Sequence, residues 1–355
     1  DNRRSRGLGD VYKRQGIATE SATNDPINAF CKLMSSMIIK LKKESNPTAK
    51  SVPNLPFTLF FDEIYSNGLD PSARFPVDRY AKLHQALMEA DEKGLIAWKK
   101  PRLAEKSELL LAHDEDYVTR FLHSDLKEEE IRRIGLRPWK DEIVERTLRL
   151  TGGALDGLDL VLSGETLAGN MAGGTHHAFR GEGAGYCIFN DLAICAEKAL
   201  LNRGISSVLI LDLDVHQGDG TAKIFQENDR VYTVSLHGKN NFPFRKQASN
   251  WDIEFENETG DMEYLRALDE VLDRLSSMEF DLIFFQAGVD GLAADALGLL
   301  DLSREGLRKR NQRVFAWRKA MDLPMLIFMG GGYADPIDHT VHAFSDLFLA
   351  AAKEV

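Results

Sequence analysis

The 355-residue sequence predicts a single α/β domain, in which a mostly parallel β-sheet is covered by helices on both faces. Short apolar runs alternate with longer segments of helical periodicity, and this alternation is typical of parallel sheets. The apolar runs, such as residues 282–287, suit strands that are buried on both faces. No internal repeat or low-complexity linker interrupts residues 53–355, so we assign this range to one domain.

The elements of this domain follow from periodicity. Residues 55–61 form the first predicted strand, and residues 77–93 the first predicted helix, because apolar residues recur there at three- and four-residue spacing. The highly charged residues 128–152 are expected to form a surface helix and a loop. Further strands are expected at 208–215, 231–236, 282–287 and 325–329, and further helices at 190–201, 264–275 and 304–320.

Residues 1–52 differ from the rest, with scattered basic residues, few acids and no regular alternation. Two interpretations stay open. The run SRGLGDVYKRQ at residues 5–15 suggests an appended, non-native sequence, whereas a short basic amphipathic helix at residues 30–41 suggests a targeting leader. In either case we expect a disordered leader outside the domain.

Composition narrows the function classes. The net charge is −11, from 44 basic and 55 acidic residues, which argues against general binding to nucleic-acid backbones. No apolar run is long enough to span a membrane, so we expect neither a nucleic-acid nor a membrane partner. The three cysteines, Cys31, Cys187 and Cys195, lack the spacing of a zinc knuckle or a disulfide framework. A reducing compartment follows: the cytoplasm, or an organelle or the nucleus if the source is eukaryotic.

The most informative segment is VLILDLDVHQGDG at residues 208–220. Asp212, Asp214 and His216 alternate along a predicted strand and therefore emerge on one side of it. Three buried ionisable groups near a strand end are costly unless something compensates their charge. A divalent cation would do so, since Asp and His form a normal ligand set for catalytic zinc. A hydrogen-bonded structural cluster explains this motif alone equally well.

A second cluster is AGGTHHA at residues 172–178, which holds His176 and His177 in a loop that stays glycine-rich up to Gly185. Glycines allow the close backbone approach that a loop around a site requires. Neutral histidine is also the natural general base near neutral pH. Taken alone, however, adjacent histidines are more often surface residues.

Two further predicted strands end in polar residues. Residues 280–290 end in Asp290, and residues 325–333 end in three glycines and Tyr333. Sites in open α/β sheets lie at the carboxyl ends of strands, so Asp290 is a candidate third metal ligand and Tyr333 a candidate oxyanion donor. A helix N-cap and a packed aromatic residue are the respective alternatives, but the joint occurrence of four such clusters favours a site.

The motifs GGTHHA, GYCIFND, DLDVHQGDG, AGVD and GGGY occur here in the order that resembles the zinc-dependent histone deacetylase family. Gln217, the GGGY ending and the segment SLHGKNNFPF make the chain most similar to class IV enzymes and their bacterial relatives. The resemblance covers residues 55–351 and implies the arginase–deacetylase fold, with an eight-stranded parallel sheet.

The same resemblance implies a metal and an oxyanion site. Asp214, His216 and Asp290 would bind Zn²⁺, and Fe²⁺ can occupy such a site in vivo. Tyr333 would stabilise the tetrahedral oxyanion together with the metal. Some branches of the family have histidine in its place and deacetylate poorly, so tyrosine favours a working deacetylase.

The two tandem histidines would have different roles. His176 would be oriented by Asp212 and His177 by Asp219, in buried pairs that fix the tautomer and raise the basicity of the imidazole. His177 would then act as the general base toward the attacking water and later protonate the leaving amine. His176 would contribute mainly electrostatic stabilisation.

Two further sets of residues are carried over from the family. A narrow apolar channel for the acylated lysine stem would be formed by Gly185, Tyr186, Phe242, Leu297 and Gly331. A structural K⁺ or Na⁺ would be bound by Asp212, Asp214, His216, Ser235 and Leu236.

The expected activity is hydrolysis of an N-acyl amine, N6-acetyl-lysine or a longer acyl-lysine in a peptide or protein. A small acylated amine such as acetylpolyamine is the alternative substrate, and a catalytically silent acyl-lysine-binding scaffold is the alternative function. A dimanganese ureohydrolase is disfavoured, because Val215 and Leu292 stand where a second ion would need carboxylates. Gln217 replaces a histidine of class I enzymes, and no acidic residue matches the one with which they grip the substrate backbone.

Overall fold

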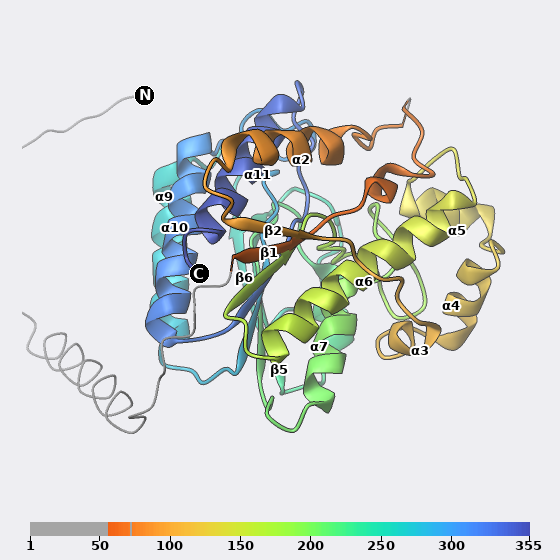
Figure 1. The fold of residues 1–355 in the computed structure, drawn as a ribbon, viewed down its shortest axis with the longest axis horizontal. Helices are drawn as coiled ribbons and strands as arrows, with labels where there is room; N and C mark the ends of the chain where they lie inside the picture. Colours follow the sequence, from red (N-terminus) through yellow and green to blue (C-terminus); the bar gives the residue numbers. More distant parts are fainter. Residues whose placement is uncertain (1–55, 72) are drawn as a thin grey trace, which may run out of the picture. The chain divides into compact units, whose positions relative to one another are not determined.

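The computed structural model describes residues 56–71 and 73–355, so the predicted leader lies outside the described residues. The described chain forms one α/β domain around an eight-stranded sheet of order β2-β1-β3-β8-β7-β4-β5-β6, in which all paired strands are parallel (Figure 1). The strands are β1 (Phe57–Phe60), β2 (Ile96–Lys99), β3 (Leu167–Asn170), β4 (Val208–Asp212), β5 (Val231–Gly238), β6 (Trp251–Phe255), β7 (Leu282–Gln286) and β8 (Met325–Phe328). The predicted fold class is confirmed.

Helices cover both faces of this sheet. On one face, α6 packs against β1, β3 and β8 while α7 packs against β4; α9, α10, α11 and α2 lie on the other side (Figure 1). The helical elements are η1 (Glu63–Ser66), α2 (Arg79–Ala90), α3 (Lys106–Leu109), α4 (Glu115–Leu122), α5 (Glu128–Ile134), α6 (Glu142–Leu162), α7 (Asp191–Leu201), α8 (Asp219–Phe225), α9 (Asp261–Leu275), α10 (Arg304–Met321) and α11 (Asp338–Ala351).

The prediction for residues 128–152 was wrong in one respect. A helix and a loop do occur there, but the last part of the segment begins α6, a 21-residue helix with a buried face. Arg146 and Gly153 lie on that face, and a side chain at Gly153 would collide with Tyr65 and Asn170. The charged residues of the segment therefore mark only the exposed side of a helix that packs on the sheet.

The strand that carries the DLDVH motif is shorter than predicted. It ends at Asp212, so Asp214 and His216 lie in the loop that follows β4. The Leu213 N–H still donates to the Gln286 carbonyl of β7, and the Asp214 N–H then donates to the Asp212 carboxylate at 3.2 Å. Since all strands are parallel, this loop meets those that follow β7 and β8 at one edge of the sheet.

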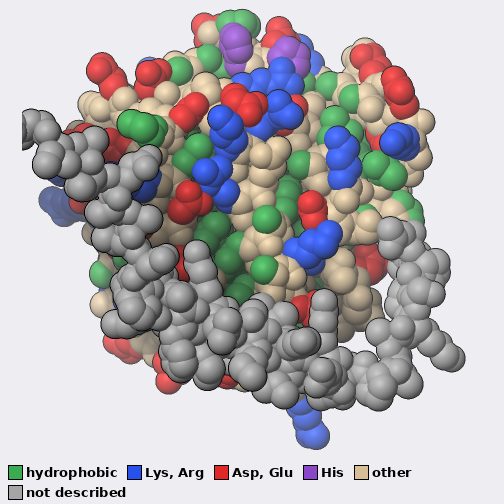
Figure 2. Space-filling view, turned by 90° about the vertical axis from the view of Figure 1, so that its left-hand side faces the viewer, with side chains coloured by type: hydrophobic (Ala, Val, Ile, Leu, Met, Phe, Trp, Pro, Cys, Tyr) green, Lys and Arg blue, Asp and Glu red, His purple; other side chains and the backbone are tan. Residues whose placement is uncertain are grey.

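The described surface carries side chains of both charges. Where described residues are visible on the face that holds α9 and α10, basic and acidic side chains are interspersed (Figure 2). Several are paired across helices, as Arg313 with Asp269 and Arg304 with Asp346. No described helix combines the length and apolar character that a membrane crossing requires.

Candidate metal and catalytic site

Three ionisable side chains converge where the loops after β4 and β7 meet. One ligand atom from each of Asp214, His216 and Asp290 lies within 4.8 Å of the others, and all three residues are buried. The His216 Nδ1 is 3.1 Å from both Asp214 Oδ1 and Asp290 Oδ2. The structure thus brings together the three residues that were predicted to bind a metal.

The other carboxylate oxygens of this cluster are already occupied by hydrogen bonds. Asp214 Oδ2 accepts from the Gln286 side chain and from the Gly331 N–H, both at 2.8 Å. Asp290 Oδ1 accepts from the Val215 N–H at 2.9 Å. One oxygen of each carboxylate therefore faces His216, while its partner oxygen anchors the side chain to the protein.

The charge balance of the cluster fits a divalent cation. Burial, together with the nearby Asp214, raises the pKa of Asp290 to about 7. Two negative charges at this separation in a buried site repel each other, which disfavours the ionised form. Burial opposes a charge on His216, but hydrogen bonds to Asp214 and Asp290 raise its pKa to about 10. The three groups therefore favour a positive charge between them, and two carboxylates with one imidazole are a suitable set for zinc or iron(II).

A buried arginine that the sequence analysis did not single out supports the two ligand loops. Arg310 of α10 is 1% exposed, and its guanidinium donates to the carbonyl oxygens of Leu213, Ala287 and Gly288 at 3.3, 3.0 and 2.6 Å. These carbonyls lie one to three residues before the ligands Asp214 and Asp290. Arg310 thus links both loops from behind, in the way that partners of metal ligands fix their orientation.

The tandem histidines form the two predicted histidine–carboxylate pairs. His176 Nδ1 lies 2.6 Å from Asp212 Oδ2, and His177 Nδ1 lies 2.7 Å from Asp219 Oδ1. All four side chains are buried, so neither pair is a solvated surface contact. A carboxylate beside Nδ1 keeps the proton on that nitrogen and leaves Nε2 as the nitrogen available for chemistry.

The two histidines have opposite charge preferences. Burial disfavours a charge on both, but the carboxylates of Asp212 and Asp214 overcome it at His176 and raise its pKa to about 9. At His177, burial and the neighbouring His176 lower the pKa to about 4, against the opposing effect of Asp219. A cationic His176 beside a neutral His177 is the arrangement expected of an electrostatic group and a general base.

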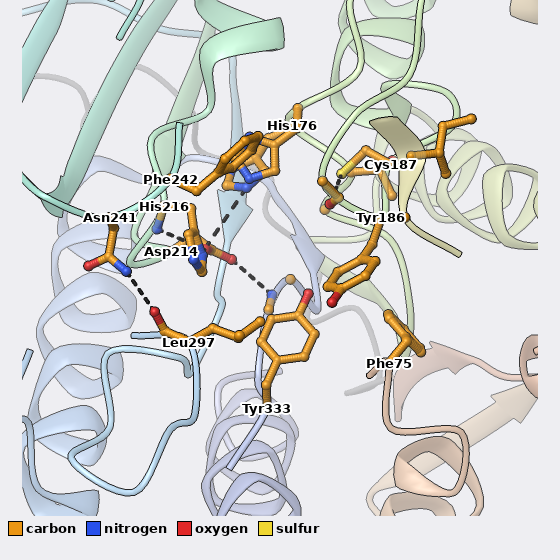
Figure 3. A pocket seen from close by; sticks show the side chains of 18 of the residues that line it. Phe75, His176, Tyr186, Cys187, Asp214, His216, Asn241, Phe242, Leu297 and Tyr333 are labelled. Atoms are coloured by element: carbon orange, nitrogen blue, oxygen red, sulfur yellow. Dashed lines mark hydrogen bonds and ion pairs between the residues drawn. The ribbon is translucent and has the colours of Figure 1, made fainter. Parts of the chain in front are cut away.

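Tyr333 enters the site from the opposite side to His176, and its ring lies beside Asp214 and Leu297 (Figure 3). Burial raises the pKa of Tyr333 well above its ordinary value, so its hydroxyl stays a hydrogen-bond donor. Its position depends on Asp295, whose carboxylate accepts from the Tyr333 N–H at 2.6 Å and from the Leu297 N–H at 2.9 Å. Asp295 was missed from the sequence because it lies within a loop without strand or helix periodicity.

A cavity of about 450 Å³ opens beside the cluster. Its lining includes all five predicted channel residues, namely Gly185, Tyr186, Phe242, Leu297 and Gly331. Asn241 joins two sides of the entrance, because its amide donates to the Leu297 carbonyl at 2.9 Å (Figure 3). Phe242 packs edge-on against His177 with ring centroids 4.8 Å apart, so the aromatic wall and the candidate base are in contact.

Gly331 has a second role beyond lining the cavity. A methyl group at this position would collide with the carboxylates of Asp290 and Asp214. We expect Gly331→Ala to lower zinc affinity at least tenfold, because even indirect disturbance of ligands commonly costs ~10- to 100-fold. Competition with a fluorescent zinc chelator measures this affinity. The exposed Gly204→Ala is the control, and equal affinities in the two variants would contradict the expectation.

A buried histidine outside the cluster stabilises the loop of His176. The Nε2 of His113 accepts the Asn190 N–H at 2.9 Å, and the Asn190 side chain donates to the Ala178 carbonyl at 3.1 Å. Burial lowers the pKa of His113 to about 4 from an ordinary 6.5. The unfolded chain therefore binds more protons between these values, so this contribution to stability is present above pH ~6.5 and is lost toward pH ~4.

We expect up to about 3 kcal/mol of stability to depend on His113 across this window, since one pKa unit corresponds to about 1.4 kcal/mol. Denaturant unfolding of the wild type and of His113→Gln at pH 7 and pH 4.5 measures it. The variant should be less stable at pH 7 and should lose less on acidification. An equal loss in both proteins would show that His113 does not titrate in this way.

Of the residues predicted for a monovalent cation, Asp212 of β4 pairs in register with Ser235 of β5, and Asp214 and His216 lie in the loop that follows β4. Leu236 is buried directly after Ser235. The Ser235 hydroxyl lies 2.9 Å from His237 Nδ1, so it already has one polar partner. A cation at this position stays a prediction.

Comparisons with known proteins agree with this architecture. Residues 74–347 match the histone deacetylase domain. An uncharacterized protein of Picosynechococcus sp. is 41% identical over 300 residues, which cover 83% of this chain and 98% of that protein. Histone deacetylase 2 of Arabidopsis thaliana is 31% identical over 252 residues, which cover 68% of this chain and 64% of that protein.

Two further matches are shorter or more distant. The acetoin utilization protein AcuC of Staphylococcus aureus is 38% identical over 152 residues, which cover 41% of this chain and 39% of that protein. The crystal structure of the HDA15 HD domain has the same fold, with a TM-score of 0.72 at 22% identity, and the match covers 85% of this chain and 91% of that one.

A parallel α/β sheet that carries these clusters at one edge, together with these relatives, defines a hydrolase of the deacetylase type. The chain belongs to the histone deacetylase family.

Proposed function

We propose that this chain is a zinc-dependent deacylase that hydrolyses the acyl amide of modified lysine side chains, with N6-acetyl-lysine as the reference substrate. The observation that carries the proposal is that Asp214 and His216 line one cavity with His177 and Tyr333, while Asp290 completes the metal cluster. A zinc ion held by the three ligands would polarise the acyl carbonyl and make a water molecule more acidic.

The protein's own residues would complete the chemistry. His177, with Nδ1 held by Asp219, would take the proton of the attacking water on Nε2 and pass it to the leaving amine. His176, kept cationic by Asp212, would stabilise the negative charge that develops on the acyl oxygen. The Tyr333 hydroxyl would donate to the same oxygen.

The residues around this centre support the narrower assignment to the class IV branch. Gln217 is buried, and its amide donates to the Gln247 carbonyl at 2.6 Å and to Asp252 at 2.8 Å. It therefore fixes the loop after the DLDVH motif without entering the metal cluster. Among the described residues, no carboxylate lines the cavity mouth where it could grip the backbone of a peptide substrate. A small acylated amine, which has no such backbone, is therefore the second candidate substrate.

Purified protein loaded with zinc tests the proposal on fluorogenic lysine peptides that carry acetyl, trifluoroacetyl or long-chain acyl groups. We expect release of the fluorophore that a hydroxamate, a strong zinc ligand, inhibits. With zinc confirmed at one per chain, release from none of the peptides would contradict the lysine assignment. Hydrolysis of acetylpolyamine by the same sample would then identify the small-amine alternative.

A further inference from the structure

The cavity continues past the catalytic residues to a buried chamber. Phe244 at the outer end is 89% exposed, whereas Arg79, Tyr80 and Arg146 at the other end are 3%, 2% and 4% exposed. Phe75 borders this inner part on the side of the site away from Phe242 (Figure 3). An acyl group that reaches the catalytic residues from the mouth therefore points toward the chamber.

Two guanidinium groups lie in this chamber, and none of the described residues supplies a counter-ion for them. Arg79 donates to the Gly332 carbonyl at 3.3 Å and to the Tyr80 hydroxyl at 3.0 Å. Arg146 donates to the Tyr65 carbonyl at 2.7 Å and reaches the same Tyr80 oxygen at 3.4 Å. In the described part of the chain, no carboxylate pairs with either arginine, and the buried Arg79 Nε has no hydrogen-bond partner.

Buried charges of like sign are expensive unless an opposite charge compensates them. Both guanidinium groups lie over the ring of Phe75. The ring centroid is 4.5 Å from the Arg79 guanidinium and 5.6 Å from that of Arg146. The two arginines also lower the pKa of Tyr80, because their positive charges outweigh the effect of burial on its hydroxyl. Asp214 is the acidic residue of the cavity lining, and it belongs to the metal cluster. The chamber is therefore positively charged and suited to an anion.

We propose that the preferred acyl group carries a carboxylate at its far end, as in lysine acylated by a dicarboxylic acid such as succinate or glutarate. This inference rests on the proposed deacylase function and names its substrate class. The distal carboxylate would bind Arg79 and Arg146 through charge-assisted hydrogen bonds. A neutral chain would instead cover the guanidinium groups without replacing their bonds to water, which is unfavourable.

The reaction is the same hydrolysis. The water oxygen bonds to the acyl carbon, the C–N bond breaks, and the amine nitrogen receives the proton. The acyl group leaves as a free dicarboxylate, and no oxidant, reductant or further reactant is consumed.

Matched four-carbon acyl groups test the proposal. Succinyl-lysine and butyryl-lysine peptides differ in the terminal carboxylate, and acetyl-lysine is the reference substrate. We expect a kcat/KM for succinyl at least about tenfold above that for butyryl in the wild type, because a charge-assisted hydrogen bond is worth at least that factor. Arg146→Met should abolish the preference, and Arg146→Lys should retain part of it.

Arg149→Met is the matched control. Arg149 belongs to the same helix, but it pairs with Asp62 and Glu145 and does not line the cavity. Its replacement should leave the succinyl-to-butyryl ratio unchanged. Free succinate should also raise the Tm of the wild type more than butyrate does, and Arg146→Met should remove this difference, which provides a readout without turnover.

Each outcome bears on a different claim. Acetyl hydrolysis with butyryl equal to or better than succinyl overturns this inference and leaves the proposed function intact. An unchanged ratio in Arg146→Met, with the variant folded, overturns it as well. If Arg146→Met does not fold, Arg146→Lys and the wild-type Tm comparison decide. Hydrolysis of none of the three acyl groups rejects the proposed function and this inference with it.

Discussion

Replacing Tyr333 by Phe should lower kcat for acetyl-lysine hydrolysis by about 10²–10³ and leave the zinc content at one per chain. Loss of a single oxyanion donor typically has this cost, because the hydrogen bond is made mainly in the transition state. Tyr333 is not a member of the metal cluster, and its backbone is held independently by Asp295. The change should therefore appear in kcat and in kcat/KM alike, with KM little altered.

Tyr232→Phe is the control for this variant. Tyr232 lies near the amino end of β5, away from the edge that carries the site, and its ring packs at a tilt against that of Phe280. Steady-state kinetics and metal analysis of the two variants separate the loss of an oxyanion donor from a general effect of removing a phenol. Turnover within a few-fold of the wild type in Tyr333→Phe would remove this residue from the mechanism.

Replacing Asp290 by Ala should reduce the bound zinc well below one per chain and eliminate measurable turnover. Loss of a group that merely supports a ligand costs ~10- to 100-fold in metal affinity, so loss of a ligand should cost more. The fold should survive, because Asp290 is repelled by Asp214, and the substitution removes that repulsion along with the hydrogen bonds from the Val215 N–H and His216.

The exposed Asp229→Ala serves as the control for general effects of losing an acid. Metal content after dialysis against limiting zinc, together with circular dichroism, measures binding and folding separately. Full zinc occupancy in a folded Asp290→Ala protein would exclude Asp290 as a ligand.

The central sheet could be predicted from the sequence because its inner strands are apolar throughout. Strands β4, β7 and β8 are buried along their whole length, and each was expected close to its observed position. The edge strands β2 and β6 were missed, since half-exposed strands carry polar residues that hide the apolar pattern. The strand β3 was missed because LAGN is short and contains glycine and asparagine.

The residues of the candidate site could be predicted where they stand next to a strand end or a glycine-rich loop. The three buried arginines near the site could not be predicted from the sequence, and the physical reason is the same for all of them. Arg79, Arg146 and Arg310 lie in helices, where a charged residue normally indicates the solvent side. Only tertiary packing shows that these three are buried, two in the inner chamber and one behind the metal cluster.

Zinc dependence of acetyl-lysine hydrolysis tests the central claim most directly. Protein stripped of metal with a chelator is titrated with zinc while hydrolysis and bound metal are followed in parallel. The proposed site predicts that activity is absent at first, rises in proportion to bound zinc and saturates at one ion per chain. Full activity in the metal-free protein, or saturation of zinc binding without any hydrolysis of acylated amines, would contradict it.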